Sequence, residues 1–257
     1  MLFSIFFYLV YQYRQQWLFI LSIFILGLVM EVLGVHVVKA YDYHGFYVMP
    51  ASVPLAIPAG WAIIIFSSVQ IVKRSNLPEW LYPFAVAFFT LIIDIALDPV
   101  MANAGVWVWK RGLTPIDFMG IPLYNFWGWF LAGFVVGISC MFLFNIKNAS
   151  LILYAIWGIS YPILWFIIFS LLRYVPYTLL YQLLWLVMLI TGILIRLYGF
   201  SRDVINVDIL FMRLSFYLAS LIVFFWSRLY ITAPYVIVII VSSLLVEIFA
   251  TSHLDVL

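Results

Sequence analysis

The chain has 257 residues, of which 68% are hydrophobic and only 9% are charged, and its mean hydropathy is +1.20. Soluble domains are about 45–50% apolar and about 25% charged, so this composition excludes a water-soluble fold and a separate soluble catalytic domain. A formal net charge of +2, with basic residues scattered singly or in pairs, argues against nucleic acid as a partner. We therefore predict an integral protein of the cell membrane, with lipid as its solvent.

Apolar stretches bounded by charged residues, proline or glycine predict seven or eight membrane helices in one domain covering residues 1–257. The first eleven residues are apolar but too short to span, so they indicate an interfacial segment or the remnant of a further helix. The fold class is therefore all-α, a polytopic, multi-pass helical bundle. The expected spans are 17–38, 53–72, 80–97, 122–145, 149–171, 178–199, 209–229 and 232–250.

Acidic residues inside apolar spans are the most informative feature, because each costs about 2.5–3.5 kcal/mol at a helix centre and usually has a task there. Three qualify, namely Glu31, Asp94 and Asp98. Glu31 follows Trp17 by fourteen residues, and Asp94 follows Trp80 by the same fourteen, so both carboxyls should lie about 21 Å along their helices. Since the first and third predicted spans run in the same direction, we expect these carboxyls near one membrane face.

Asp94 and Asp98 are one helical turn apart and should share a helix side. Pro99 is expected to end that helix and to leave Asp98 at the negative end of the helix dipole. Burial, the dipole and a neighbouring carboxyl all favour the protonated form, so at least one of the three acids should hold its proton near neutral pH, as a general acid must. The alternative is that each acid pairs structurally with Arg or Tyr between helices. Glu247, isolated near the end of the last span, is interpreted as structural.

Aromatic residues gather at the same predicted face, in the two long connections 39–52 and 98–121 and at the neighbouring helix ends. Many of them are explained by the general enrichment of Trp and Tyr at the membrane–water interface, but aromatic faces also stabilise carbocations. Carboxyls beside tryptophans suit the protonation of an apolar alkene. Cys140, the single cysteine, excludes a disulfide framework and a thiolate metal site. The candidate substrate-binding residues are Tyr41, Tyr43, Trp61, Trp107, Trp109, Asn125 and Trp129.

Six short blocks in residues 31–130 together resemble the membrane carotenoid biosynthesis family, whose best-known members are the hydratases of the bacterioruberin and deinoxanthin pathways. Residues 131–257 are expected to add further membrane helices without matching motifs. The blocks are Glu31-Val-Leu-Gly-Val35, Tyr41-x-Tyr43, Val53-Pro-Leu-Ala-Ile-Pro58 with Trp61, Asp94-x-x-x-Asp98-Pro99, Trp107-x-Trp109 and Gly120-Ile-Pro-Leu-Tyr-Asn-Phe-Trp-Gly-Trp-Phe130.

The resemblance implies addition of water to the terminal 1,2 double bond of an acyclic C40 or C50 carotenoid, as in bacterioruberin-type pathways, with no metal or organic cofactor. Asp94 or Glu31 would be the acid, and Asp98 would be its partner, the base toward water, or both in sequence. The expected partners are a lipid-soluble carotenoid and membrane lipid, and the resemblance also allows contact with other enzymes of the pathway.

Three rival functions stay open at this point. A carotenoid cyclase of the lycopene type would trap the same cation with an internal double bond. An intramembrane prenyl transferase would bind magnesium diphosphate through paired aspartates, but only one such pair is present. A pigment-binding or transport protein would use the acids as a proton relay.

Overall fold

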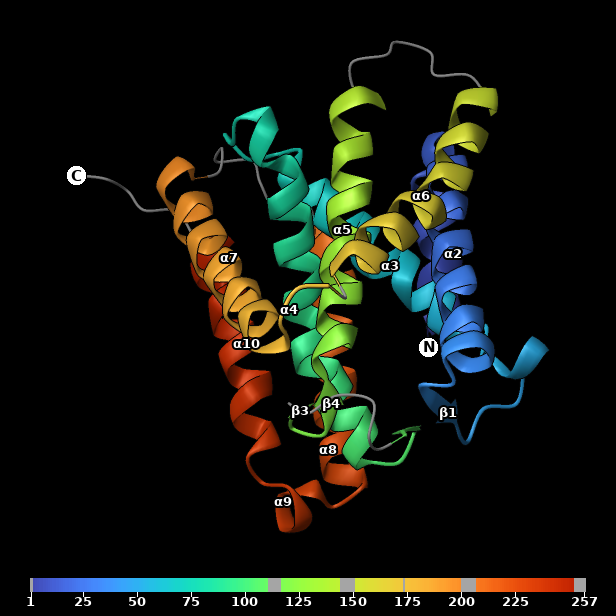
Figure 1. Ribbon diagram of the computed structural model, residues 1–257, viewed down its shortest axis with the longest axis vertical. Coiled ribbons are helices and arrows are strands. Elements are labelled where there is room, and N and C mark those ends of the chain that lie inside the picture. Colours follow the sequence, from blue (N-terminus) through green and yellow to red (C-terminus); the bar gives the residue numbers. More distant parts are fainter. Residues whose placement is uncertain (1, 111–116, 144–150, 173, 200–206, 252–257) are drawn as a thin grey trace.

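The structure, a computed structural model, describes residues 2–110, 117–143, 151–172, 174–199 and 207–251. It is a bundle of α-helices with short 3-10 and π segments and two small two-stranded ribbons (Figure 1). The α-helices are α1 (Leu2–Gln12), α2 (Trp17–Val32), α3 (Ala56–Val72), α4 (Tyr82–Asn103), α5 (Leu123–Leu143), α6 (Leu151–Leu172), α7 (Tyr177–Tyr198), α8 (Val207–Trp226), α9 (Leu229–Thr232) and α10 (Val236–Thr251).

The two ribbons lie near the lower end of the bundle as it is drawn in Figure 1. One pairs β1 with β2 and the other pairs β3 with β4, both antiparallel. The strands are β1 (Tyr41–Tyr43), β2 (Trp107–Trp109), β3 (Asp117–Phe118) and β4 (Ile121–Pro122). The short helical segments are η1 (Arg14–Gln16), η2 (Leu33–Val38, a π-helix), η3 (Pro50–Ser52) and η4 (Glu79–Leu81).

The predicted all-α bundle is confirmed. In the described ranges, five helical stretches are long and apolar enough to cross a membrane, while α1, α3 and α10 are apolar but shorter. The count of seven or eight spans therefore stays a prediction, and the predicted ends of the spans 122–145 and 149–171 extend into residues 144–150, outside the described part. The five stretches are Arg14–Val38, Glu79–Asn103, Leu123–Phe142, Tyr177–Tyr198 and Val207–Trp226.

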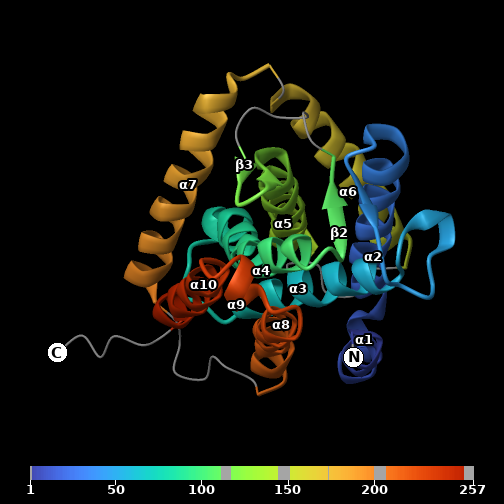
Figure 2. The same ribbon diagram turned by 90° about the horizontal axis from the view of Figure 1, so that it is seen from below.

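Helix α4 is the centre of the bundle and packs against α3, α5, α7, α8 and α10. Figure 2 shows α3, α4 and α5 enclosed between α7 and α10 on one side and α2 and α6 on the other. Gly133 and Gly137 let α5 approach α4, because a Cβ atom at these positions would lie 2.7 Å from Ala87 Cα and 2.5 Å from Pro83 Cα. This small-x-x-x-small pattern is typical of tight helix packing in lipid.

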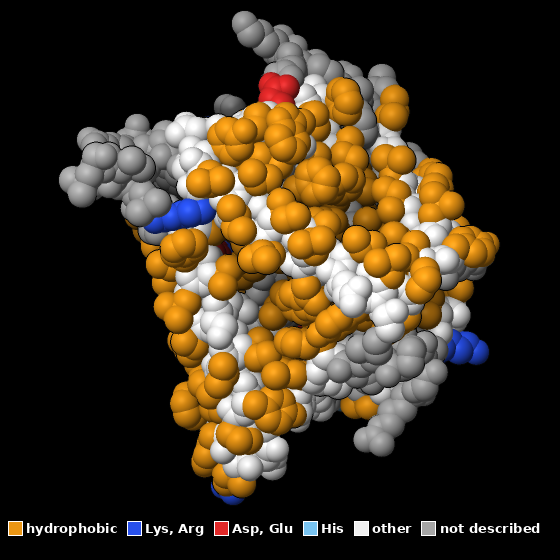
Figure 3. Space-filling view, turned by 60° about the vertical axis from the view of Figure 1, so that its left-hand side comes forward, with side chains coloured by type: hydrophobic (Ala, Val, Ile, Leu, Met, Phe, Trp, Pro, Cys, Tyr) orange, Lys and Arg blue, Asp and Glu red, His pale blue; other side chains and the backbone are white. Residues whose placement is uncertain are grey.

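Hydrophobic side chains predominate on the face on which α7 and α10 lie, and charged side chains lie near its edges (Figure 3). It is hollowed by an apolar groove of about 1040 Å³ between α4, α7 and α10. Most side chains exposed on these helices, such as Leu189 on α7 and Val238 on α10, are aliphatic. Such a surface is suited to lipid.

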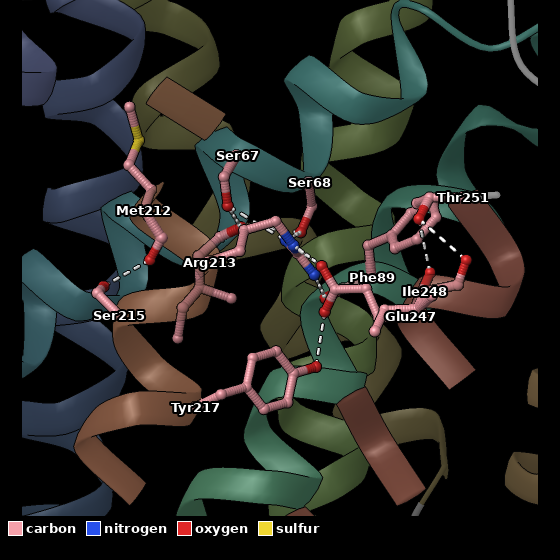
Figure 4. Close-up of polar contacts among 11 residues, drawn as sticks. Ser67, Ser68, Phe89, Met212, Arg213, Ser215, Tyr217, Glu247, Ile248 and Thr251 are labelled. Atoms are coloured by element: carbon pink, nitrogen blue, oxygen red, sulfur yellow. Dashed lines mark hydrogen bonds and ion pairs between the residues drawn. The ribbon is translucent and has the colours of Figure 1, made fainter. Parts of the chain in front are cut away.

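A buried ion pair joins α8 to α10, and it corrects the interpretation of Glu247 as isolated. Arg213 pairs with Glu247, whose other oxygen accepts a hydrogen bond of 2.6 Å from Tyr217 (Figure 4). The Arg213 guanidinium also donates to the Ser68 hydroxyl at 2.9 Å and to the Phe89 carbonyl at 2.7 Å. Sequence spacing does not reveal this pair, because Arg213 lies 34 residues from Glu247 and on another helix. Its partners tie α8 and α10 to α3 and α4.

Candidate active site

Glu31, near the end of α2, is buried and accepts three hydrogen bonds. The hydroxyls of Tyr41 and Tyr43 donate to Oε2 at 2.6 Å and 2.5 Å, and the Trp61 indole N–H donates to Oε1 at 2.9 Å. The two tyrosines come from β1 and the tryptophan from α3. Both carboxyl oxygens therefore act as acceptors, which fixes the orientation of the group, and the three donors stabilise the carboxylate, which is the form that a proton acceptor needs.

Two glycines, Gly27 on α2 and Gly34 on the segment η2 that follows it, make room for these donors. A Cβ atom at Gly27 would lie 2.8 Å from the Trp61 Cβ, and one at Gly34 would lie 2.5 Å from the Tyr41 hydroxyl oxygen. Directly after Glu31 and Val32 the helix widens into the π-helix η2 (Leu33–Val38), a conformation that is frequent at functional sites. Gly27 and Gly34 thus leave the space in which Tyr41, Tyr43 and Trp61 surround the Glu31 carboxyl. We call this arrangement the Glu31 socket.

Asp94 and Asp98 are both buried on α4 and share one donor. The side-chain amide of Asn125, on α5, donates to Asp98 Oδ2 at 2.6 Å and to Asp94 Oδ2 at 3.2 Å. Two neighbouring carboxyls that share a single donor are suited to hold one proton between them, as paired aspartates do in other enzymes. In the described ranges, no three His, Cys, Asp or Glu side chains are placed to hold a metal ion.

The expectation that Pro99 ends this helix is wrong. Helix α4 continues to Asn103, so Asp98 lies inside the helix and not at its C-terminal dipole end. A proline inside a helix removes one backbone hydrogen bond, and neighbouring helices and polar side chains can compensate in membrane proteins. Here the Asn103 side-chain amide donates to the Pro99 carbonyl at 2.7 Å, and the neighbouring α4 positions 98–100 are buried.

The β1–β2 ribbon joins the two long aromatic connections. Its register pairs Tyr41 with Trp109 and Tyr43 with Trp107, and because side chains alternate along a strand, all four rings share one face. The Tyr41 and Trp109 ring centroids lie 4.6 Å apart, edge to face. The intervening Asp42 is exposed on the other face and pairs with Lys110 at 3.1 Å. The ribbon therefore presents an aromatic face toward the carboxyls.

The environment of Tyr41 and Tyr43 keeps both hydroxyls protonated. Burial, and next the charge of the neighbouring Glu31 carboxyl, raise the pKa of each tyrosine well above its usual value. Below that pKa a tyrosine is neutral and can donate. Both hydroxyls therefore remain hydrogen-bond donors to Glu31 throughout the neutral pH range.

One cavity of about 340 Å³ collects these groups. All ten candidate residues named from the sequence line it, which brings together the three acids, Asn125 and the six aromatic residues. Trp61 and Trp129, which both line it, stack directly on each other with ring centroids 4.1 Å apart. The rest of the wall is largely apolar, so the cavity combines proton-transfer groups with a surface that suits a hydrocarbon. It is chemically equipped to protonate an alkene and to shield the resulting cation.

The family of the chain follows from comparison with known proteins. A family model described as "Carotenoid biosynthesis protein" matches residues 1–198. The chain belongs to this carotenoid biosynthesis protein family. Its role is therefore in carotenoid biosynthesis, its substrate class is lipophilic, and it is a membrane protein. No match was found among curated proteins or among solved structures.

The family match extends beyond the blocks at 31–130 and ends at residue 198, the last residue of α7. Sequence reasoning missed part of the cavity wall, which α8 supplies through Phe216, Ala219 and Val223. These apolar residues give no motif, and only the packing of α8 against α3 and α4 places them there. It also missed Gly27, whose role depends on the approach of α3 and carries no local signal.

Proposed function

We propose that this carotenoid biosynthesis protein is a hydratase that adds water to the terminal 1,2 double bond of an acyclic C40 or C50 carotenoid. The observation that carries the proposal is the unequal hydrogen bonding of three buried acids around one apolar cavity. Glu31 accepts from three donors, whereas Asp94 and Asp98 share Asn125. Hydration needs both a proton donor and a proton acceptor, and the two arrangements suit these two roles.

In the first step, the Asp94–Asp98 pair gives its proton to the less substituted carbon of the terminal double bond. A C–H bond forms, the π bond breaks, and a tertiary carbocation remains beside an aspartate carboxylate. The stacked rings of Trp61 and Trp129 would face the cation, and a desolvated aromatic face contributes about 2 kcal/mol to its stabilisation. Asn125 would hold the aspartate pair in position during the transfer.

In the second step, water attacks the cation and forms the C–O bond of a tertiary alcohol. The proton that this water loses goes to Glu31, whose two oxygens are held by the three donors. Return of that proton to the aspartate pair through solvent restores the starting state. The overall reaction consumes one alkene and one water and needs no change of oxidation state.

The size of the cavity supports binding of one chain end. Ligand pockets are about 300–1,000 Å³, and this cavity of about 340 Å³ is near the lower limit. A polyene of 40 or more carbons would place its terminal unit there and leave the remainder among the helices or in lipid. We further propose a multi-pass arrangement in the cell membrane, with all 257 residues in one domain and with membrane lipid around it.

Expression in a cell that accumulates lycopene tests the proposal by mass analysis of the pigments. The wild type should give products heavier by one or two waters, whereas a cyclase would leave the mass unchanged. Asp94→Asn and Glu31→Gln should give no hydroxylated product at matched protein levels in the membrane. Hydroxylated pigment from either variant at the wild-type level would contradict the assigned roles.

A further inference from the structure

A second cavity, of about 250 Å³, adjoins the candidate active site on its other side. It lies between the end of α2 with η2, α5 and α6, whereas the first cavity extends along α3, α4 and α8. The two cavities therefore meet at a common wall. Six residues line both cavities, namely Glu31, Tyr41, Trp61, Trp109, Asn125 and Trp129.

The second cavity, unlike the first, is lined at one end by exposed residues of η2. Val37 and Val38 line it and are 69% and 52% exposed, and Lys39 follows them directly at the end of the first long apolar stretch. A lysine at the end of a span usually reaches the aqueous interface. The inner wall carries the hydroxyl-bearing Tyr124 and Ser170. This end of the cavity is thus placed for water, while the first cavity is bounded by apolar side chains of α3 and α8.

Trp109 stands where the two cavities meet. Its indole nitrogen is buried and has no hydrogen-bond partner among the described residues. A buried donor without a partner is unusual, because it has lost its hydration without replacement. The Trp109 ring also packs edge to face on Tyr41, whose hydroxyl donates to Glu31. An N–H group in this position can donate to a water oxygen close to the Glu31 carboxyl.

We infer that the second cavity admits the reacting water and that Trp109 holds this water against Glu31. The inference rests on the proposed hydratase function. The water oxygen would accept from the Trp109 N–H, one O–H would donate to Glu31, and the remaining lone pair would form the bond to the carbocation. The proton released goes to Glu31. Trp109 is then a catalytic residue through its contact with the attacking water, and Ser170 shapes the route.

The experiment uses the full chain in membranes, with lycopene as the probe and D₂O in the buffer. Ser170→Leu adds bulk to the second cavity, and Trp109→Phe removes the N–H while keeping an aromatic ring. Ile167→Phe, on an exposed part of α6 that does not line the cavity, is the control for added bulk. Alcohol is measured by mass, and deuterium in the recovered hydrocarbon reports cations that formed but lost a proton instead of capturing water.

Trp109→Phe should lower the alcohol by about tenfold, the effect of one lost hydrogen bond of ordinary strength, and Ser170→Leu should lower it by obstructing the route of the water. Deuterium in the hydrocarbon should not fall, because the acid step is intact, and the control should match the wild type. Alcohol within twofold of the wild type in both variants would overturn the inference. Equal loss of alcohol and deuterium would also overturn it, since a merely structural defect stops both steps. If the wild type forms no alcohol, the hydratase proposal itself fails.

Discussion

Replacing Gly34 with alanine is expected to disable the Glu31 socket through a single methyl group. The added Cβ would lie 2.5 Å from the Tyr41 hydroxyl oxygen. That oxygen would have to retreat by about 1 Å to reach ordinary van der Waals contact. Its hydrogen bond to Glu31, now 2.6 Å, would then exceed the usual limit. A hydrogen bond to a charged group contributes about 1.5–3 kcal/mol, so turnover should fall by about 10- to 150-fold.

The assay is the rate of alcohol formation in membranes at matched protein levels, with Val35→Ala as the neighbouring control. Tyr41→Phe removes the same hydrogen bond without a clash and should lower the rate to a similar extent. The double variant Gly34→Ala/Tyr41→Phe should then be close in rate to Tyr41→Phe alone, because the closest clash, with the hydroxyl oxygen, is gone and the ring carbons at 3.0 and 3.3 Å need to shift by only a few tenths of an ångström. Multiplication of the two single effects would refute this reasoning, as would wild-type activity in Gly34→Ala.

Two further predictions concern stability. Glu247→Gln leaves the Arg213 charge buried without its counter-ion and should lower the free energy of unfolding by about 3–5 kcal/mol. The double variant Arg213→Leu/Glu247→Leu removes both charges and should lower it much less. Thermal unfolding in detergent measures both variants, and equal losses of stability would contradict the assignment of an ion pair. Burial raises the pKa of Tyr43 above its usual value of about 10. Above pH 10 the unfolded chain therefore loses this proton first, and stability should fall as pH rises. Tyr43→Phe should show a shallower decline in Tm from pH 9 to 11, and an unchanged slope would contradict the burial of this hydroxyl.

The convergence of the three acids could be predicted because the depth of a residue in a membrane helix follows from its distance in sequence to the start of that helix. Trp17 and Trp80 mark the starts of two helices that run in the same direction, and equal counts from each lead to Glu31 and Asp94. The structure places both on one cavity. The pairing of Tyr41 with Trp109 could not be predicted, since β-ribbons between distant loops depend on the helices that bring those loops together.

Two sequence-based predictions are wrong because tertiary contacts override the local sequence pattern. The general rule that proline stops a helix fails at Pro99, because Asp98 is buried and Asn103 donates a hydrogen bond to the Pro99 carbonyl in a helix that continues. Glu247 looks isolated in the sequence because its counter-ion lies on another helix. In both cases the compensating group comes from a position that sequence spacing alone does not identify.

Reaction of the purified protein with lycopene in H₂¹⁸O tests the central claim most directly. The wild type should form a tertiary alcohol that carries one ¹⁸O per hydrated end, and Asp94→Asn should form none. A product of unchanged mass, or an alcohol that carries no label from the solvent water, would contradict acid-catalysed hydration in this cavity.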